Sequence, residues 1–257
     1  MAGGAAARNR PHALRSRAVT ARLDLEYDGT HFYGWARQPG QRTVQEAIEA
    51  ALGRILQREV PLTVAGRTDR GVHATGQVAS YDGPALRAEA LNALLPPDVA
   101  VRACAQARED FDARRDARSR SYRYRVRHTR IRTPFEAGRA LWWPHRLDRD
   151  LLHACAALLP GTHDFTAFTP TDTYHTRFDR NVIAARWVED GDDLAFEIEA
   201  DTFMRHMNRV LAGTMLQVAG GRRPLEDFAA LLEGAHRRDA GPTAPPHGLY
   251  LTGVRYG

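Results

Sequence analysis

The pattern of apolar and polar residues in the first part of the chain predicts four strands and two helices in the order β-α-β-β-α-β. Apolar residues recur at every second position in the strand segments and at every third or fourth position in the helical segments. Thr43 and Glu46 fit a capping box, in which side chains satisfy the free backbone N–H groups that begin a helix. The expected strands cover residues 19–27, 60–65, 76–81 and 98–106, and the expected helices cover 44–56 and 86–95.

The second part of the chain repeats this order with one extra helix. Within residues 119–128, Tyr122, Tyr124 and Val126 alternate with arginines, and this two-residue period is typical of a strand. The expected strands cover residues 119–128, 181–189, 194–200 and 248–256, and the expected helices cover 148–159, 202–218 and 225–232.

Both halves match the ferredoxin-like arrangement, which predicts an α+β protein. We expect two ferredoxin-like (βαββαβ) halves whose antiparallel sheets form one extended sheet with helices on one face. The N-terminal domain is expected at residues 19–107 and the C-terminal domain at 108–257. Residues 1–18 are rich in arginine and lack an apolar segment, so we expect a disordered basic tail there.

Composition favours an acidic partner and excludes several kinds of chemistry. The net charge is +5 and the pI is about 9.6, a bias toward partners such as nucleic acid. All 36 basic residues are arginines, so a phosphate-loop lysine and a Schiff-base lysine are both absent. Cys104 and Cys155 have no metal-ligand spacing and are expected to be thiols in a reducing compartment. No apolar run is long enough to span a membrane, so we expect a cytoplasmic protein.

A carboxylate between two guanidinium groups marks the loop that joins two expected strands of the first half. Asp69 lies between Arg67 and Arg70, and Gly66 and Gly71 bracket the loop. A loop held by rigid strands can aim a side chain outward, as catalytic loops do. Aspartate is also common in ordinary turns, where it satisfies local backbone N–H groups. Local chemistry therefore leaves both a catalytic and a structural role open.

Two further positions have alternative interpretations. Tyr122 can face the hydrophobic core, or it can lie against a nucleobase, where stacking contributes about 1–3 kcal/mol. Arg205 lies near the start of an expected helix, where the helix dipole disfavours a cation. It therefore indicates an anionic partner, either a phosphate or a carboxylate. The eleven histidines form no metal-binding motif, so no metal site is expected.

Taken together, these residues resemble the TruA family of tRNA pseudouridine synthases, which isomerise uridines in the anticodon stem-loop. The most specific match is Gly-Arg-Thr-Asp-Arg-Gly-Val-His, at residues 66–73. Arg70 is a departure, because family members often carry alanine at this position. The matching stretches occur in the family's order and extend over nearly the whole chain: residues 26–30, 33–38, 43–45, 65–77, 120–124, 163–168, 203–209 and 248–251.

The resemblance implies a role for four residues. Asp69 matches the catalytic aspartate, and Arg205 matches the basic residue paired with it. Tyr122 matches the tyrosine that packs against the target base, and Arg67 matches the arginine that displaces the target nucleotide from the stem. The resemblance also implies modification at tRNA positions 38, 39 and 40, a homodimer that binds tRNA across both subunits, and no metal or organic cofactor.

Two alternatives from other classes stay open at this stage. One is a non-catalytic RNA-binding module with two RRM-like halves, for which Asp69 would be dispensable. The other is a hydrolase that uses Asp69 as a nucleophile on a small substrate. Even within the synthase hypothesis, the carboxylate can act either as a nucleophile at C1′ or in loss of the 2′ proton to a glycal-like intermediate.

Overall fold

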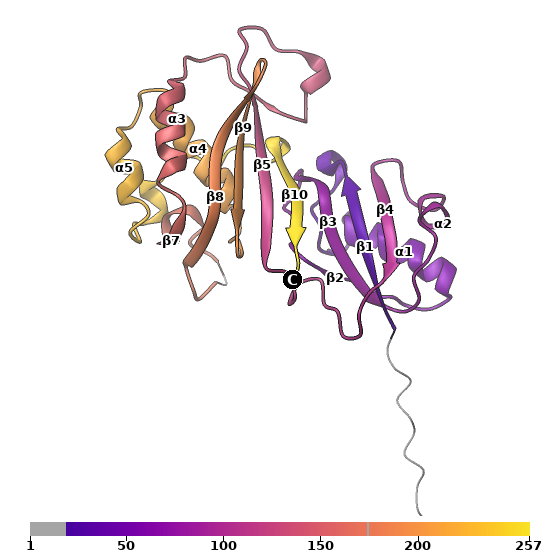
Figure 1. The fold of residues 1–257 in the computed structure, drawn as a ribbon. Helices are drawn as coiled ribbons and strands as arrows, with labels where there is room; N and C mark the ends of the chain where they lie inside the picture. The colour runs from indigo at the N-terminus through magenta and orange to yellow at the C-terminus, as the bar shows by residue number, and fades with distance from the viewer. Residues whose placement is uncertain (1–18, 174) are drawn as a thin grey trace, which may run out of the picture.

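One ten-stranded sheet runs through the whole molecule in a computed structural model that describes residues 19–173 and 175–257 (Figure 1). Eight strands form the path β4-β1-β3-β10-β5-β9-β8-β7, with β2 paired to β3 and β6 paired to β5. The predicted α+β fold with one extended sheet is confirmed. The tail expected at residues 1–18 lies outside the described residues.

The N-terminal half contributes one side of this sheet. Strand β1 (Thr20–Tyr27) lies between β3 (His73–Asp82) and β4 (Val99–Gln106), and both pairings are antiparallel. Helix α1 (Val44–Leu56) begins as predicted, because the Thr43 side chain accepts a hydrogen bond from the Glu46 N–H. Strand β2 is shorter than expected, at Thr63–Val64, and helix α2 covers Ala88–Asn92.

The C-terminal half forms the other side, in the strand order β10-β5-β9-β8-β7. Its hydrophobic pattern located the four long strands, but two short ones were missed because each is only a few residues long and lies at an edge. The strands are β5 (Ser119–Arg127), β6 (Leu141–Trp142), β7 (Gly161–Asp164), β8 (Asp179–Asp190), β9 (Asp193–Ala200) and β10 (Leu249–Arg255). The helices are α3 (Arg149–Ala157), α4 (Met207–Ala219) and α5 (Leu225–Ala230).

The two halves join where β10 pairs with β3 in parallel, through Tyr250 with His73 and Leu251 with Ala74. Strand β2 pairs antiparallel with the other end of β3, at Ala79 and Ser80. The loop from β2 to β3, which contains Asp69, therefore starts at a strand paired with β3 and ends on β3 itself, the strand that forms the seam between the two halves.

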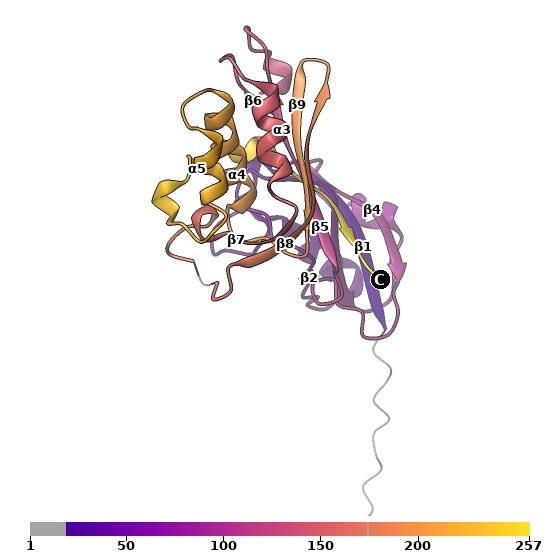
Figure 2. The same cartoon turned by 60° about the vertical axis from the view of Figure 1, so that its left-hand side comes forward.

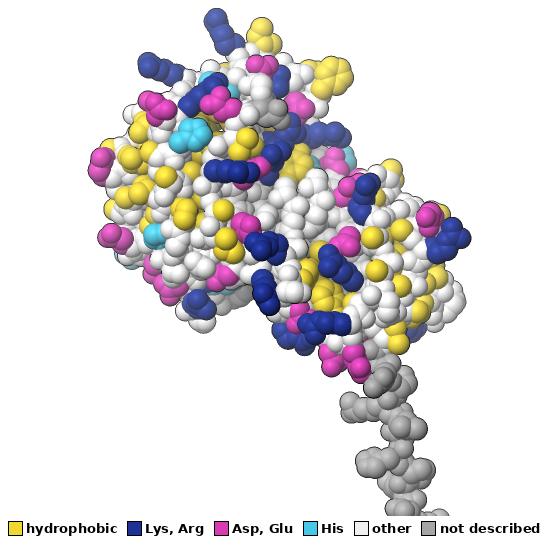
Figure 3. Space-filling model, in the orientation of Figure 1, with side chains coloured by type: hydrophobic (Ala, Val, Ile, Leu, Met, Phe, Trp, Pro, Cys, Tyr) yellow, Lys and Arg dark blue, Asp and Glu magenta, His cyan; other side chains and the backbone are white. Residues whose placement is uncertain are grey.

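The helices cover one face of the sheet (Figure 2) and bury its apolar side chains. Tyr124 points toward this helical side and is fully buried. Arg123 and Arg125 point to the opposite face, where they form ion pairs with Glu197 and Asp193. Figure 3 shows arginine side chains on the visible face with acidic side chains among them. No helix in the described part of the chain is long and apolar enough to cross a membrane.

Helix α4 starts five residues later than the pattern predicted. We expected a helix over 202–218, but the helical turns begin at Met207. His206 precedes them with a left-handed backbone (φ 64°, ψ −4°), which cannot belong to a right-handed helix. Periodicity detected the buried face of α4 but not this break, because a single left-handed residue leaves no trace in the hydrophobic pattern.

Candidate active site

The loop that carries Asp69 is fixed by its neighbours in the N-terminal half. Trp35 donates its backbone N–H to the Thr68 carbonyl at 3.0 Å, and Gly71 donates to the Phe32 carbonyl at 3.3 Å. The backbone before α1 approaches the loop so closely that a Cβ on Gly34, which has φ +96°, would lie 2.8 Å from the Thr68 oxygen. Glycine is therefore required at this contact.

A buried polar network holds the loop from the sheet side. The Tyr27 hydroxyl lies 2.8 Å from the Thr68 hydroxyl, and the Gln77 amide donates to both the Tyr27 hydroxyl and the Gly66 carbonyl. Burial raises the pKa of Tyr27 to about 12, so this phenol remains a neutral hydrogen-bonding group. Because each buried polar group has a partner, the network fixes the position of the loop backbone.

Arg120 of β5 anchors the start of the same loop from the C-terminal half. Its guanidinium donates to the carbonyl of Ala65 through two nitrogens, at 2.8 and 3.0 Å. It also donates to the carbonyls of Arg114, Ala117 and Asp201 at 2.9–3.2 Å. Arg120 is buried, and burial lowers its pKa. One side chain thus ties four separate backbone positions together.

We expect Arg120→Met to lower the free energy of unfolding by about 2–4 kcal/mol, because several buried carbonyls would lose their donor. Urea denaturation of both proteins measures this difference. Arg186→Met is the matched control, since that arginine pairs with Glu197 on the surface and its side chain is 71% exposed. The control should change stability by less than about 1 kcal/mol. Equal effects of the two substitutions would contradict the anchoring role.

His73 closes the other end of the loop. Gly29 donates its N–H to Nδ1 of His73 at 3.0 Å, and Nε2 lies 3.0 Å from the Gly138 carbonyl. These two contacts fit the neutral tautomer with the proton on Nε2, and Oδ1 of Asp28 lies 3.2 Å from Nδ1 beside the Gly29 N–H. Burial lowers the pKa of His73, which agrees with a neutral ring. The loop is therefore held at both ends by segments from each half of the chain.

Asp69 faces the start of α4 across the seam. Its Oδ2 lies 3.4 Å from Nη1 of Arg209 and 3.5 Å from Nε2 of His206. The Arg209 side chain is only 13% exposed, and its Nε donates to the Ala244 carbonyl at 2.8 Å. Both side-chain contacts use the same carboxylate oxygen, so within the described residues Oδ1 has no side-chain partner and is available to a substrate.

Arg205 does not pair with Asp69, which corrects that expectation. Its guanidinium instead forms an ion pair with Asp172, in the segment between β7 and β8. The prediction of an anionic partner was right, and that partner is a carboxylate. The pairing differs because the turn at His206 orients Arg205 toward Asp172, while Arg209, four residues later, lies on the side of α4 that faces Asp69.

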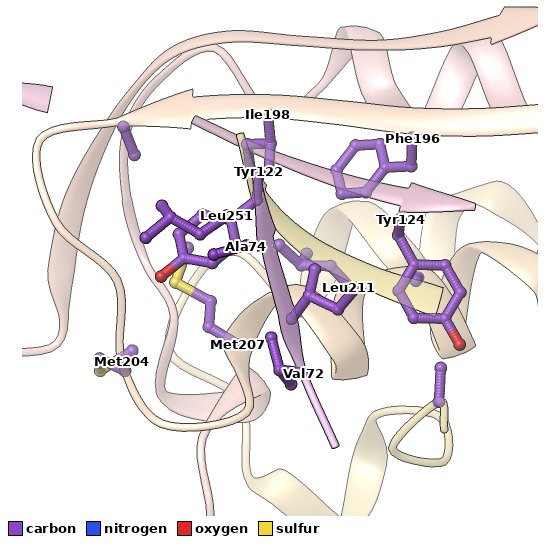
Figure 4. Packing of buried hydrophobic residues seen from close by; sticks show 14 of the residues in the cluster. Val72, Ala74, Tyr122, Tyr124, Phe196, Ile198, Met204, Met207, Leu211 and Leu251 are labelled. Carbon is purple, nitrogen blue, oxygen red and sulfur yellow. The ribbon is translucent and has the colours of Figure 1, made fainter. Parts of the chain in front are cut away.

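Tyr122 lies in the floor of a cleft of about 980 Å³ between the two halves, which Asp69, Arg67, Arg205 and Arg209 also line. Figure 4 shows Tyr122 beside Met207 and Leu251, with Tyr124 farther along the strand. Tyr122 is 8% exposed and contacts the Phe203 ring edge-on, with the ring centroids 4.9 Å apart. Burial raises its pKa, so the hydroxyl stays protonated. Tyr122 thus belongs to the core and to the cleft at once.

The remaining arginines of the loop are exposed at the cleft. Arg67 makes no hydrogen bond or ion pair with the rest of the described chain and is free to meet a ligand. Arg70 lies over the Tyr33 ring, with its guanidinium carbon 4.2 Å from the ring centroid. This cation–π contact stabilises Arg70 on the N-terminal side of the cleft.

Sequence reasoning missed Arg209, His206 and Arg120 as parts of the site. Arg209 and His206 lie in residues 203–209, one of the stretches that resemble the family, but a helix expected from residue 202 gave no reason to choose Arg209 over Arg205. No local pattern identifies Arg120, because its four acceptors lie in separate segments of the chain.

Comparison with known proteins identifies the class to which this fold and cleft belong. The chain matches the family described as tRNA pseudouridine synthase over residues 25–116 and 155–257. Enzymes of this class are isomerases that convert uridine to pseudouridine. The alternatives of a non-catalytic RNA-binding module and of a hydrolase are therefore set aside.

Individual relatives indicate a particular family within this class. The chain is 43% identical over 244 residues to tRNA pseudouridine synthase A of Myxococcus xanthus, covering 91% of each chain. It is 41% identical over 245 residues to the enzyme of the same name from Bacillus pumilus, covering 93% of this chain and 99% of the relative. The chain belongs to the tRNA pseudouridine synthase A family.

Proposed function

We propose that the protein isomerises uridine to pseudouridine at positions 38, 39 and 40 of the tRNA anticodon stem-loop, with Asp69 as the essential residue. The observation that carries this proposal is the placement of Asp69. Its carboxylate projects from a rigid loop into the cleft, with one oxygen held by Arg209 and His206 and the other free. The positions within tRNA follow from the sequence resemblance.

The reaction breaks the N1–C1′ glycosidic bond, turns the base and joins C5 to C1′. The proton on C5 leaves to solvent and N1 takes up a proton, so the net change is an isomerisation without a redox step. Asp69 serves in one of two ways: Oδ1 attacks C1′, or it accepts the 2′ proton on the route through a glycal-like intermediate. In both, Arg209 contacts Oδ2 and leaves Oδ1 to meet the ribose.

A target uridine in a stem must leave the base stack before it reaches Asp69, which costs a few kcal/mol. Arg67 is exposed, lies two residues from Asp69 and lines the cleft, so it is placed to fill the gap that the base leaves. Tyr122 offers a ring in the floor of the cleft against which the extruded base packs. These contacts would offset part of the cost of extrusion.

Charge distribution favours the cleft over the open face of the sheet as the tRNA-binding surface. On the open face Arg123 and Arg127 are neutralised by acidic partners on β9 and in the turn before it. At the cleft, Arg67 and Arg114 form no ion pair with any other described residue. Arginines without acidic partners are the ones available to phosphates.

The proposal includes a homodimer that holds tRNA across both subunits, and a cytoplasmic location. Both rest on the sequence resemblance, and the reducing compartment agrees with the thiols of Cys104 and Cys155, which form no disulfide.

The experiment that tests the substrate uses unmodified tRNA transcripts with uridine at positions 38, 39 and 40. After incubation with the protein, chemical mapping should detect pseudouridine at these positions and nowhere in the D arm or acceptor stem. Transcripts in which cytidine replaces the three uridines are the control and should remain unmodified. Modification elsewhere, or none at all, would overturn the assignment of these positions.

A further inference from the structure

His206 has a backbone conformation that other residues in the described chain rarely adopt. It is one of three described non-glycine residues with a positive φ, the others being Gln57 and Asp110. A left-handed residue other than glycine is uncommon, and it is a conformation that histidine and asparagine tolerate better than most residues. The His206 side chain does not cap α4, although its carbonyl accepts the first helical hydrogen bonds, from the N–H groups of Arg209 and Val210. The helix start therefore uses the backbone of His206 and leaves its imidazole available to another partner.

The left-handed turn brings the imidazole of His206 toward the carboxylate of Asp69. Nε2 lies 3.5 Å from Oδ2, and the side chain is 31% exposed at the cleft. Arg209 contacts the same oxygen from the next turn of the chain. Two groups from one short segment thus meet one carboxylate oxygen, and strained residues of this kind cluster at functional sites.

Burial favours the neutral form of the His206 ring. Burial lowers the pKa of His206, and the nearby Arg209, Arg205 and Arg237 act in the same direction, whereas Asp69 opposes them. A neutral imidazole has a single N–H donor, and a carboxylate opposite Nε2 favours the tautomer with the proton there. The ring then donates to Asp69 without adding a positive charge to the site.

We propose that His206 is a positioning residue for the reaction, whose Nε2–H donates to Oδ2 of Asp69 and fixes the carboxylate so that Oδ1 faces the ribose. The inference rests on the proposed function of Asp69. The distance of 3.5 Å in the free protein is long for a hydrogen bond, and such contacts tighten when substrate closes the site.

The test compares His206→Gly with His206→Gln in steady-state kinetics on unmodified tRNA. Glycine accepts a left-handed backbone, and Gln57 shows that glutamine adopts one in this protein. Only glutamine keeps an N–H donor, at the position that Nε2 occupies in histidine. We expect His206→Gly to lower kcat about 10-fold, the usual effect of losing a hydrogen bond to a charged group, with KM unchanged. His206→Gln should recover part of this loss.

Two readouts separate a positioning role from a purely structural one. A structural defect would change kcat and KM together and would not be repaired by glutamine, whereas a positioning role predicts that kcat alone falls in His206→Gly and partly recovers in His206→Gln. Equal kcat values for the two variants would overturn the positioning role. If instead the wild-type protein leaves tRNA unmodified, or Asp69→Asn is fully active, the proposed function itself fails.

Discussion

Asp69→Asn is expected to reduce turnover by at least about 10³-fold, because an amide can neither attack C1′ nor accept a proton from the ribose. The substitution keeps the shape of the side chain and its contact with Arg209. The loop backbone should be unaffected, since its bonds to Trp35, Gln77 and Arg120 do not involve the carboxylate. Release of tritium from tRNA that contains C5-tritiated uridine measures turnover.

Two controls distinguish a loss of chemistry from a general loss of structure or of tRNA binding. Filter binding should show that Asp69→Asn retains affinity for tRNA, because contacts to phosphates dominate such affinity. Asp172→Asn is the control: it removes a carboxylate that also pairs with an arginine of the cleft, but one far more exposed, at 76%. Its turnover should remain near wild type. Comparable turnover by Asp69→Asn and Asp172→Asn would exclude an essential role for Asp69.

Arg209→Gln is expected to lower kcat about 100-fold, since it removes a partly buried charge-assisted contact to the carboxylate of Asp69. The Arg209 side chain is 13% exposed, so water cannot readily replace its guanidinium. Part of the loss will come from the bond between Arg209 Nε and the Ala244 carbonyl, which orders the segment before β10. Single-turnover measurements at saturating enzyme report the chemical step directly.

Arg205→Gln is the informative comparison, because it lies one helical turn away in the sequence and lines the same cleft. Its ion pair is with Asp172 and not with Asp69. We expect weaker tRNA binding with little change in the single-turnover rate. Arg209→Lys should recover part of the activity lost in Arg209→Gln, because it restores the charge without the planar fork. A larger loss of the chemical step in Arg205→Gln than in Arg209→Gln would reverse the assignment.

Much of the fold could be predicted from local patterns in the sequence. The alternation of Tyr122 and Tyr124 with arginines located β5, and Thr43 located the start of α1, because such features depend on neighbouring residues alone. The order of elements in each half then predicted two ferredoxin-like units. Strands β6 and β7 were missed, because two to four residues are too few to establish a period.

The candidate site could be predicted only in part from the sequence. The glycines around Asp69 and the charges beside it mark a functional loop within eight residues of sequence, and its resemblance to a known family gave the chemistry. The catalytic roles of Asp69, Tyr122 and Arg67 stay predictions that the experiments above address. The basic residue that contacts Asp69 could not be predicted, because Asp69 and Arg209 are 140 residues apart along the chain.

The sequence by itself therefore located the long strands, the helices and the loop that presents Asp69. Tertiary structure alone decided that Arg209 and His206 meet this carboxylate, that Arg205 pairs with Asp172, and that Arg120 ties the loop to the C-terminal half. The physical reason is the range of the interactions. Periodicity and capping act over a few residues, whereas these contacts depend on the seam between β3 and β10 and on one left-handed residue before α4.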